Sequence, residues 1–334
     1  ITTANTLDTI PRPLLDRMEV IELSSYTDEE KVQIGKKHLL PKEMKRHGLE
    51  KSQLKVSDSA LREIISAYTR ESGVRVLERM LAAICRKTAI RVVSDGVKSI
   101  HITEKDLKEY LGVPRYYPER QALEERIGVV NGLAWTSVGG ELLEVEVNVV
   151  PGAGKVELTG NLGDVMKESA YAALSFIRSQ SDRLGIPADF YKEKDIHVHF
   201  PEGAVPKDGP SAGIAITTAM VSALTGCPVR RGIAMTGEVT LRGRVLPIGG
   251  LKEKTMAAFR NGIKTVILPA DNGKDLEEID QTVRKAIQFI LVERADQVLS
   301  AALSHPLPSA EEQREPSAPV LGTAKRAPGP RLRQ

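Results

Sequence analysis

Residues 201–224 read PEGAVPKDGPSAGIAITTAMVSAL, a loop rich in Gly and Pro that runs into an almost wholly apolar segment of helical length. Ser211 lies at the junction, so we expect its hydroxyl at a helix N-terminus. Backbone N–H groups lack partners there and the dipole end is positive, which can stabilise an oxyanion. Ser is also a favoured N-cap residue, so the local pattern alone leaves a purely structural role open.

Residues 209–213 also match G-x-S-x-G, the turn that carries the nucleophile in many hydrolases. That turn needs a strand directly before it and a histidine later in the chain. Here a long loop precedes Ser211, and the only later histidine, His305, opens a tail rich in proline. A serine-histidine-aspartate triad is therefore disfavoured, and a nucleophilic Ser211 needs a different base.

A candidate base lies in residues 246–269, LPIGGLKEKTMAAFRNGIKTVILP, where two glycines open a predicted helix. The helix carries Lys252 and Lys254, with Met and Ala residues behind them. A lysine that an apolar pocket keeps neutral can take the proton of a serine hydroxyl. The segment alone equally fits a solvated lysine on a helix surface.

Two other motifs do not support a cofactor site. GAGK at residues 152–155 resembles part of a phosphate loop, but Val149 stands where the first glycine belongs and Val156 replaces the Ser or Thr that binds magnesium. We expect a hairpin turn there. His197 and His199 alternate along DIHVHF, yet a catalytic zinc site needs a third ligand and no H-E-x-x-H or C-x-x-C motif is present. We therefore predict neither a complete ATP site nor a metal site.

The composition sets the class of protein. The chain has 334 residues, 41% hydrophobic and 27% charged, which is enough for about two domains. A net charge of +3 without basic clusters does not demand a nucleic-acid partner. Cys85 and Cys227 lie far apart among apolar residues, which suits a reducing compartment. With no segment of membrane-spanning length and no signal peptide, we expect a soluble, intracellular protein, and a start without Met indicates a fragment of a longer chain.

The periodicity of the sequence predicts an α+β fold. Thr27 and Glu30 form a capping box before a helical pattern that Pro41 should end. Further helices are expected near residues 57–69, 72–93 and 103–111. After a polar segment with two prolines, strand patterns precede a helix over about 163–183, and helices and strands then alternate to about residue 303.

Several blocks in order resemble one known family. The blocks PKDGPSAG (206–213), AMTGEVTLRG (234–243), VLPIGGLKEK (245–254) and GLAWTSVGG (132–140) are together similar to the proteolytic domain of the A-type, ATP-dependent Lon proteases. Upstream, TANTLDTIPRPLLDRMEVIEL (3–23) resembles the end of their AAA+ module, and YTRESGVRVLER (68–79) resembles its small helical part.

The resemblance implies a small all-α AAA+ lid domain followed by a mixed α/β peptidase domain. Its boundaries would be a remnant of the AAA+ core over 1–22, the lid over 23–113, a linker over 114–126, the protease domain over 127–304 and a disordered tail over 305–334. It makes Ser211 the nucleophile and Lys254 the base. It gives further roles to Thr236 (hydrogen bond to the lysine), Asp208 (gating of the site), Trp135 and Glu146 (substrate groove), and Asn5, Arg17 and Arg75 (nucleotide sensing).

The same resemblance implies partners and cofactors. Peptide cleavage by a Ser-Lys pair needs no cofactor, whereas the full-length enzyme would use ATP and Mg. The phosphate loop that such modules need is missing from this chain, so we expect no ATP hydrolysis by it. Substrates would be unfolded proteins, the intact enzyme would form a cytoplasmic homohexamer, and a DNA partner is possible but not indicated.

Two alternatives remain open from the sequence. One is a fragment of an AAA+ regulator with an appended binding domain, which would need no nucleophile. The other is a serine-lysine hydrolase of small esters or amides. Labelling of Ser211 by a serine-directed inhibitor distinguishes a protease from the first alternative. A comparison of casein digestion with hydrolysis of a short ester distinguishes it from the second.

Overall fold

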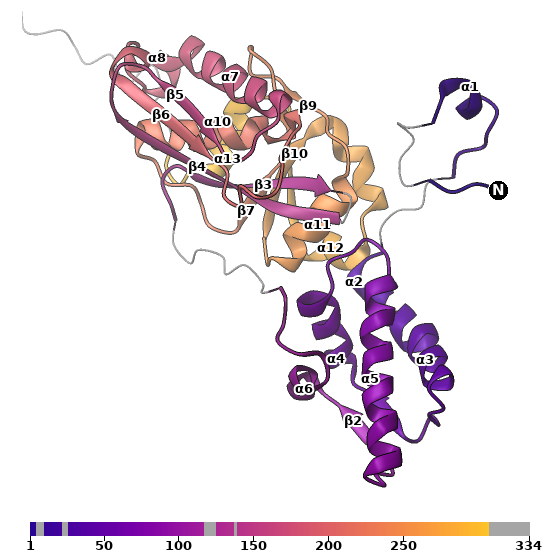
Figure 1. The fold of residues 1–334 in the computed structure, drawn as a ribbon. Helices are drawn as coiled ribbons and strands as arrows, with labels where there is room; N and C mark the ends of the chain where they lie inside the picture. The colour runs from indigo at the N-terminus through magenta and orange to yellow at the C-terminus, as the bar shows by residue number, and fades with distance from the viewer. Residues whose placement is uncertain (5–9, 22–25, 117–124, 137–138, 307–334) are drawn as a thin grey trace, which may run out of the picture.

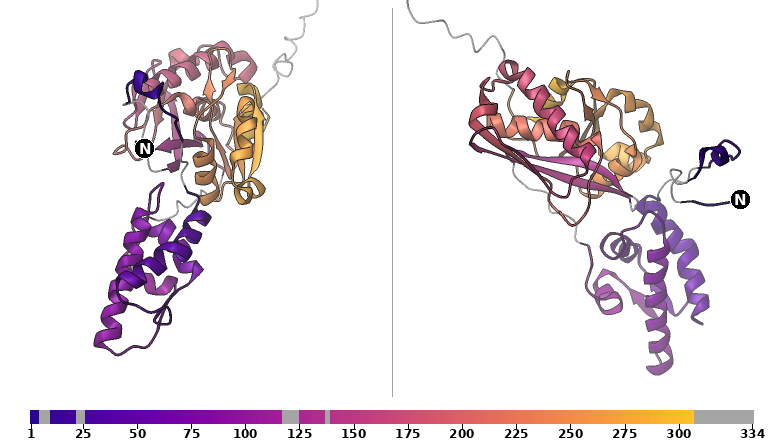
Figure 2. Two further views of the ribbon diagram at one scale, coloured as in Figure 1. Left: turned by 90° about the vertical axis from the view of Figure 1, so that its right-hand side faces the viewer. Right: turned by 45° about the horizontal axis from the view of Figure 1, so that its top comes forward.

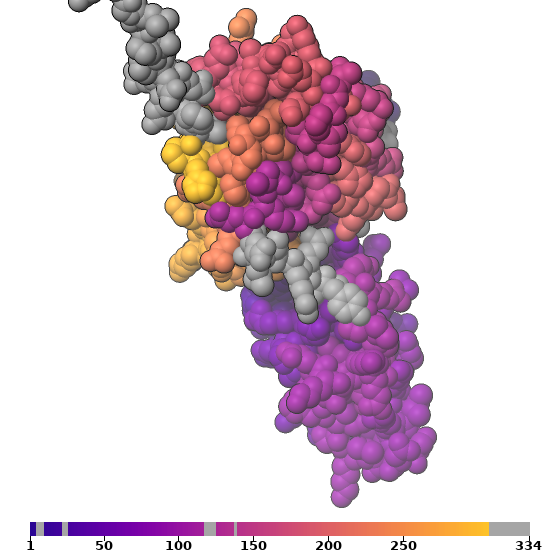
Figure 3. All heavy atoms as spheres, turned by 90° about the vertical axis from the view of Figure 1, so that its left-hand side faces the viewer, coloured from indigo at the N-terminus to yellow at the C-terminus, as the bar shows by residue number. Residues whose placement is uncertain are grey.

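The computed structural model describes the chain except for residues 5–9, 22–25, 117–124, 137–138 and 307–334. Its main parts are a helical domain over residues 26–116 and a sheet domain over 125–306, which form separate lobes (Figures 1, 2 and 3). The short helix α1 (Arg12–Leu15) precedes them. Most of the predicted linker and tail lies outside the described residues.

The helical domain has one apolar core, to which its helices contribute residues such as Leu61, Leu77 and Leu81. Thr27 and Glu30 form the predicted capping box, with Glu30 N donating to Thr27 Oγ1 at 3.2 Å and Thr27 N donating to Glu30 Oε2 at 2.7 Å. The helical elements are α2 (Asp28–Ile34), the π-helical η1 (Gly35–Leu39), α3 (Leu40–Arg46), α4 (Asp58–Glu63), the π-helical η2 (Ile64–Tyr68), α5 (Arg75–Ser94), the 3₁₀ turn η3 (Glu104–Asp106) and α6 (Leu107–Leu111). Strands β1 (Leu54–Val56) and β2 (Ile100–Ile102) pair in parallel.

The prediction that Pro41 ends the first helix is wrong. The π-helical turn η1 leads directly into α3, and Pro41 occupies the first turn of that helix. A proline inside a continuous helix donates no N–H and its ring crowds the preceding turn, and the wider π-helical turn, in which Leu40 N donates to Gly35 O, accommodates it. The change of helix type at Gly35–Leu39 therefore lets the chain stay helical through a residue that usually stops it.

The sheet domain is built on seven strands in the order β11-β10-β7-β3-β4-β6-β5. Strands β3, β7, β10 and β11 are parallel, while β4 runs antiparallel to both β3 and β6. The strands are β3 (Val129–Thr136), β4 (Gly139–Pro151), β5 (Val156–Thr159), β6 (Lys194–His199), β7 (Ile233–Met235), β10 (Thr265–Pro269) and β11 (Gln288–Val292), and β8 (Glu238–Val239) and β9 (Val245–Leu246) form a separate hairpin.

Helices cover the sheet from two sides with two different cores. The larger core joins one face of the sheet to α7 (Asp164–Ser179), α10 (Gly213–Thr225) and α13 (Ala295–Ala302), and also includes Leu184 of α8 (Ser181–Leu184) and Phe190 of α9 (Phe190–Glu193). The smaller core joins the other face, at β3, β7 and β10, to α11 (Leu251–Arg260) and α12 (Gln281–Ala286), next to the 3₁₀ segment η5 (Ala270–Glu278). The expected α+β class, a helical lid followed by a mixed α/β domain, is confirmed.

The GAGK segment is not the hairpin turn that we expected. It connects β4 to β5, but these strands do not pair with each other because β6 lies between them. The Asp195 carboxylate at the start of β6 accepts from Ala153 N at 2.9 Å and Lys155 N at 2.7 Å. A Cβ on Gly152 would lie 2.1 Å from the Asp195 carboxyl carbon, which explains the glycine as a packing requirement.

The paired histidines lie on the polar face of β6. Thr159 Oγ1 is 2.8 Å from His197 Nε2 and 2.7 Å from His199 Nδ1. Across the described ranges, no group of three or more His, Cys, Asp or Glu residues is placed to hold a metal ion. Cys85 and Cys227 are free thiols. No helix in the described part of the chain is long and apolar enough to cross a membrane.

Candidate active site

Ser211 lies in the 3₁₀ turn η4 (Pro210–Ala212) that leads into α10. Gly209 before it has φ of +124°, a conformation that favours glycine. Gly237 N donates to Ser211 O at 2.8 Å, and Ile214 N donates to Gly237 O at 3.0 Å. These two bonds fix the serine turn against the chain that follows β7. The half-buried Ser211 therefore sits one turn before α10 proper, at the positive end of that helix.

Lys254 lies in the first turn of α11, on the opposite side of the sheet. The residue is 2% exposed. Burial lowers the pKa of its ammonium group from 10.5 to about 8, because the charged form loses its hydration. Among the described residues no carboxylate forms an ion pair with it. The pocket thus favours a neutral amine, which is the form that can accept a proton.

Thr236 joins the two candidate catalytic residues. It directly follows β7 and is completely buried. Lys254 Nζ donates to Thr236 Oγ1 at 3.1 Å, and Thr236 Oγ1 donates to Ser211 O at 3.4 Å. No hydrogen bond between described atoms joins Lys254 Nζ to the Ser211 hydroxyl directly. The end of β7 therefore brings a helix from each face of the sheet to one point.

Asp208 holds the loop before Ser211 in place. Its Oδ1 accepts from Met166 N at 3.0 Å, in the first turn of α7, and from Gly209 N at 2.9 Å. Gly163, the N-cap of α7, has no side chain to cap that helix, and a Cβ there would lie 2.2 Å from the Asp208 carboxyl carbon. Asp208 therefore caps α7 from a distant loop, in agreement with a carboxylate at a positive helix end.

The two predicted groove residues lie at opposite ends of one strand pair. Trp135 is 59% exposed, pairs with Gly140, and a Cβ on Gly250 would lie 3.0 Å from the Trp135 Cβ. Trp135 thus lies beside the N-terminus of α11. Glu146 instead pairs with Val129, at the far end of β3. Among the described residues Glu146 forms no hydrogen bond or ion pair with Ser211, and the regular alternation of β4 makes its polar residues indistinguishable in sequence.

Two of the three predicted nucleotide-sensing residues lie within the described part of the chain, and neither forms a hydrogen bond or ion pair there with Ser211, Thr236 or Lys254. Arg17 follows α1 and is exposed, and Arg75 is the exposed first residue of α5. Asn5 lies outside the described residues.

Sequence reasoning missed two glycines that shape the site. One is Gly237, whose N–H holds the serine turn. The other is Gly140 at the start of β4, where a Cβ would lie 2.0 Å from Glu253 O and 2.9 Å from Lys254 N. Both glycines follow strand-like segments within the quoted blocks, and a glycine at a strand end is a signal of close backbone approach.

Comparisons with known proteins cover most of the chain. Residues 101–305 match the Lon protease (S16) C-terminal proteolytic domain, and residues 45–100 match the Lon protease AAA+ ATPase lid domain. Similar proteins include a Lon protease of Desulforamulus reducens (55% identity over 91% of this chain and 37% of the relative) and Lon protease 1 of Bacillus subtilis (56%, 91% and 39%). A Lon protease of Vibrio parahaemolyticus is 56% identical over 91% of this chain and 39% of its own length. The chain spans less than two fifths of the length of these relatives. It belongs to the Lon protease family, whose serine endopeptidase domain and AAA+ lid it carries.

Proposed function

We propose that the chain hydrolyses peptide bonds with Ser211 as the nucleophile and Lys254 as the general base. The observation that carries the proposal is the buried Lys254 amine, which pairs with no carboxylate in the described part of the chain and bonds through Thr236 to the serine turn. The direct contact between the amine and the Ser211 hydroxyl would form when substrate is bound, because catalytic hydrogen bonds are often long in free enzymes.

The proposed reaction passes through an acyl-enzyme. The neutral Lys254 amine takes the Ser211 proton while the serine oxygen attacks the peptide carbonyl carbon. Backbone N–H groups of the turn around Ser211 stabilise the resulting oxyanion. The lysine ammonium then gives its proton to the leaving amine. Water attacks the ester with Lys254 again acting as the base, which releases the second product and restores the serine.

The test is Ser211→Ala with cleavage of casein and of a short fluorogenic peptide as readouts. We expect the variant to fold, at a cost of about 1 kcal/mol or less near a helix start, and to lose all cleavage. A serine-directed phosphonate should label the parent chain at Ser211. A folded Ser211→Ala variant that still cleaves at the parent rate would overturn the assignment. Cleavage of a short ester but not of casein would favour the small-substrate hydrolase instead.

The family resemblance also indicates the assembly in which this activity would take place. We propose that the chain works as the proteolytic part of an ATP-dependent, cytoplasmic homohexamer that degrades unfolded proteins. ATP and Mg would be held by the full-length enzyme. Arg17 and Arg75 do not fit a nucleotide site on their own, since they lie on separate elements and the sequence has no phosphate loop. No step of peptide cleavage uses the nucleotide.

A further inference from the structure

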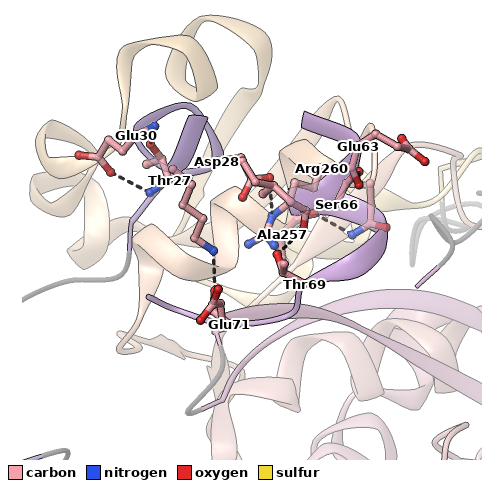
Figure 4. A network of polar contacts seen from close by, with 12 residues as sticks. Thr27, Asp28, Glu30, Glu63, Ser66, Thr69, Glu71, Ala257 and Arg260 are labelled. Carbon is pink, nitrogen blue, oxygen red and sulfur yellow. Dashed lines mark hydrogen bonds and ion pairs between the residues drawn. The ribbon is translucent and has the colours of Figure 1, made fainter. Parts of the chain in front are cut away.

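Two ion pairs join the helical domain to α11, which carries Lys254, and to the start of β4 beside it. Asp28 at the start of α2 lies with Oδ2 3.6 Å from Arg260 Nε, at the end of α11 (Figure 4). Arg70 Nη2 lies 2.9 Å from Glu141 Oε1 at the start of β4. The four side chains are 19–45% exposed, so these pairs are partly shielded from solvent. One pair holds α11 and the other holds the strand beside it.

The strand contact reaches the lysine through the backbone. Gly140, next to Glu141, packs so closely on α11 that a Cβ would meet Glu253 O and Lys254 N. Any shift of Glu141 along or away from the helix therefore moves the backbone that bears the lysine. Close packing transmits such shifts because interiors have low compressibility.

The helical-domain side of the contact is firmly built. Lys31 of α2 is 4% exposed, and its Nζ donates to Glu71 O. The Glu71 carboxylate in turn accepts from Val76 N at 2.9 Å and Leu77 N at 2.8 Å, at the start of α5. Asp28 and Arg70 thus project from a surface in which α2 and α5 are tied together.

We propose that the helical domain positions Lys254 for catalysis through the Asp28–Arg260 and Arg70–Glu141 ion pairs. This proposal rests on the proposed function. None of the four residues touches the reacting atoms, so each acts as a positioning residue through α11 and β4. The position of the Lys254 amine would then depend on the position of the helical domain. Loss of both ion pairs would leave the site folded but would displace the amine.

The experiment measures kcat and KM for a fluorogenic peptide with the full chain. The single variants are Arg260→Met and Glu141→Gln, and Lys36→Met is the matched control because it breaks a pair inside the helical domain, Lys36–Asp58 at 2.7 Å. Partly exposed pairs contribute up to about fivefold each, so we expect kcat to fall about threefold in each single variant and about tenfold in the double variant. KM should stay within about twofold, and Arg260→Lys should keep most of the activity.

A double-mutant cycle identifies the pair as the cause. Asp28→Asn combined with Arg260→Met should lower kcat no more than Arg260→Met alone, because both changes remove one interaction. Unchanged kcat in the Arg260→Met, Glu141→Gln double variant would overturn the proposal, as would an equal loss in Lys36→Met. Failure of the proposed function is distinguishable, since the parent chain itself would then neither cleave peptide nor be labelled at Ser211, and that result would overturn both.

Discussion

At the scale of single residues, Lys254 depends on apolar surroundings in which no described carboxylate pairs with its amine. Burial is the cause of its lowered pKa, and its hydrogen-bond partner is a neutral hydroxyl. A carboxylate in that place would hold the proton on the amine and prevent it from acting as a base. The fold, and not the local sequence, creates this uncharged environment, because the residues around Lys254 would fit a solvated helix surface equally well.

The pH dependence follows from that pKa. Below about pH 8 the amine is protonated and cannot take the serine proton, so kcat/KM should rise with pH through one ionisation near 8 and then level off. Lys254→Arg should be inactive, because a guanidinium keeps its proton in this range. Lys252→Ala should stay within about twofold of the parent, since residues two apart on a helix point to different faces. Loss of cleavage in Lys252→Ala with retention in Lys254→Arg would move the base to the other lysine.

Thr236 offers a second test at this scale. Thr236→Val keeps the shape of the side chain but removes the hydroxyl that accepts from Lys254 Nζ and donates to Ser211 O. We expect kcat to fall by about tenfold or more, because the amine loses its orienting bond. Thr236→Ser should keep most of the activity. The measurement is steady-state kinetics of both variants, with circular dichroism to verify folding. Full activity in Thr236→Val would show that the hydroxyl does not contribute to catalysis.

At the scale of helices and strands, the sequence predicted what local chemistry determines. The Thr27 capping box and the helices near residues 57–69 and 163–183 follow from capping and periodicity. Two features could not be predicted from the sequence: the helix that continues through Pro41, and the position of β5 next to β6 instead of β4. Both the π-helical turn and the order of strands are decided by tertiary packing. The bridging geometry of Thr236 was reached only through family resemblance.

Gly140 tests the contact between β4 and α11. Gly140→Ala would place a Cβ 2.0 Å from Glu253 O, so strand or helix must shift. We expect a loss of about 1–3 kcal/mol in the free energy of unfolding, together with reduced cleavage. Gly249→Ala is the matched control, because a Cβ there meets nothing within 4 Å and the residue is exposed. Urea unfolding of both variants gives the comparison, and equal stability of the two would contradict the close packing.

At the scale of the whole molecule, two helices from opposite faces of the sheet meet at the end of β7. Ser211 lies in the turn before α10, which packs in the larger core. Lys254 lies on α11, which packs in the smaller core. Open sheets with parallel strands commonly bind ligands beyond the carboxyl ends of those strands. Among the described residues, two ion pairs join the helical domain to α11 and to the start of β4, which packs on α11. A movement of that domain would therefore act on the base more than on the nucleophile.

The same layout predicts how the chain responds to nucleotide. Arg17 and Arg75 are exposed on separate elements, and the sequence offers no loop of backbone N–H groups to hold phosphates. We expect isothermal titration calorimetry with ATP and Mg to show no binding at micromolar concentrations, and peptide cleavage to proceed at the same rate with and without ATP. Micromolar binding to this chain, or cleavage that requires ATP, would show that its own residues form a nucleotide site.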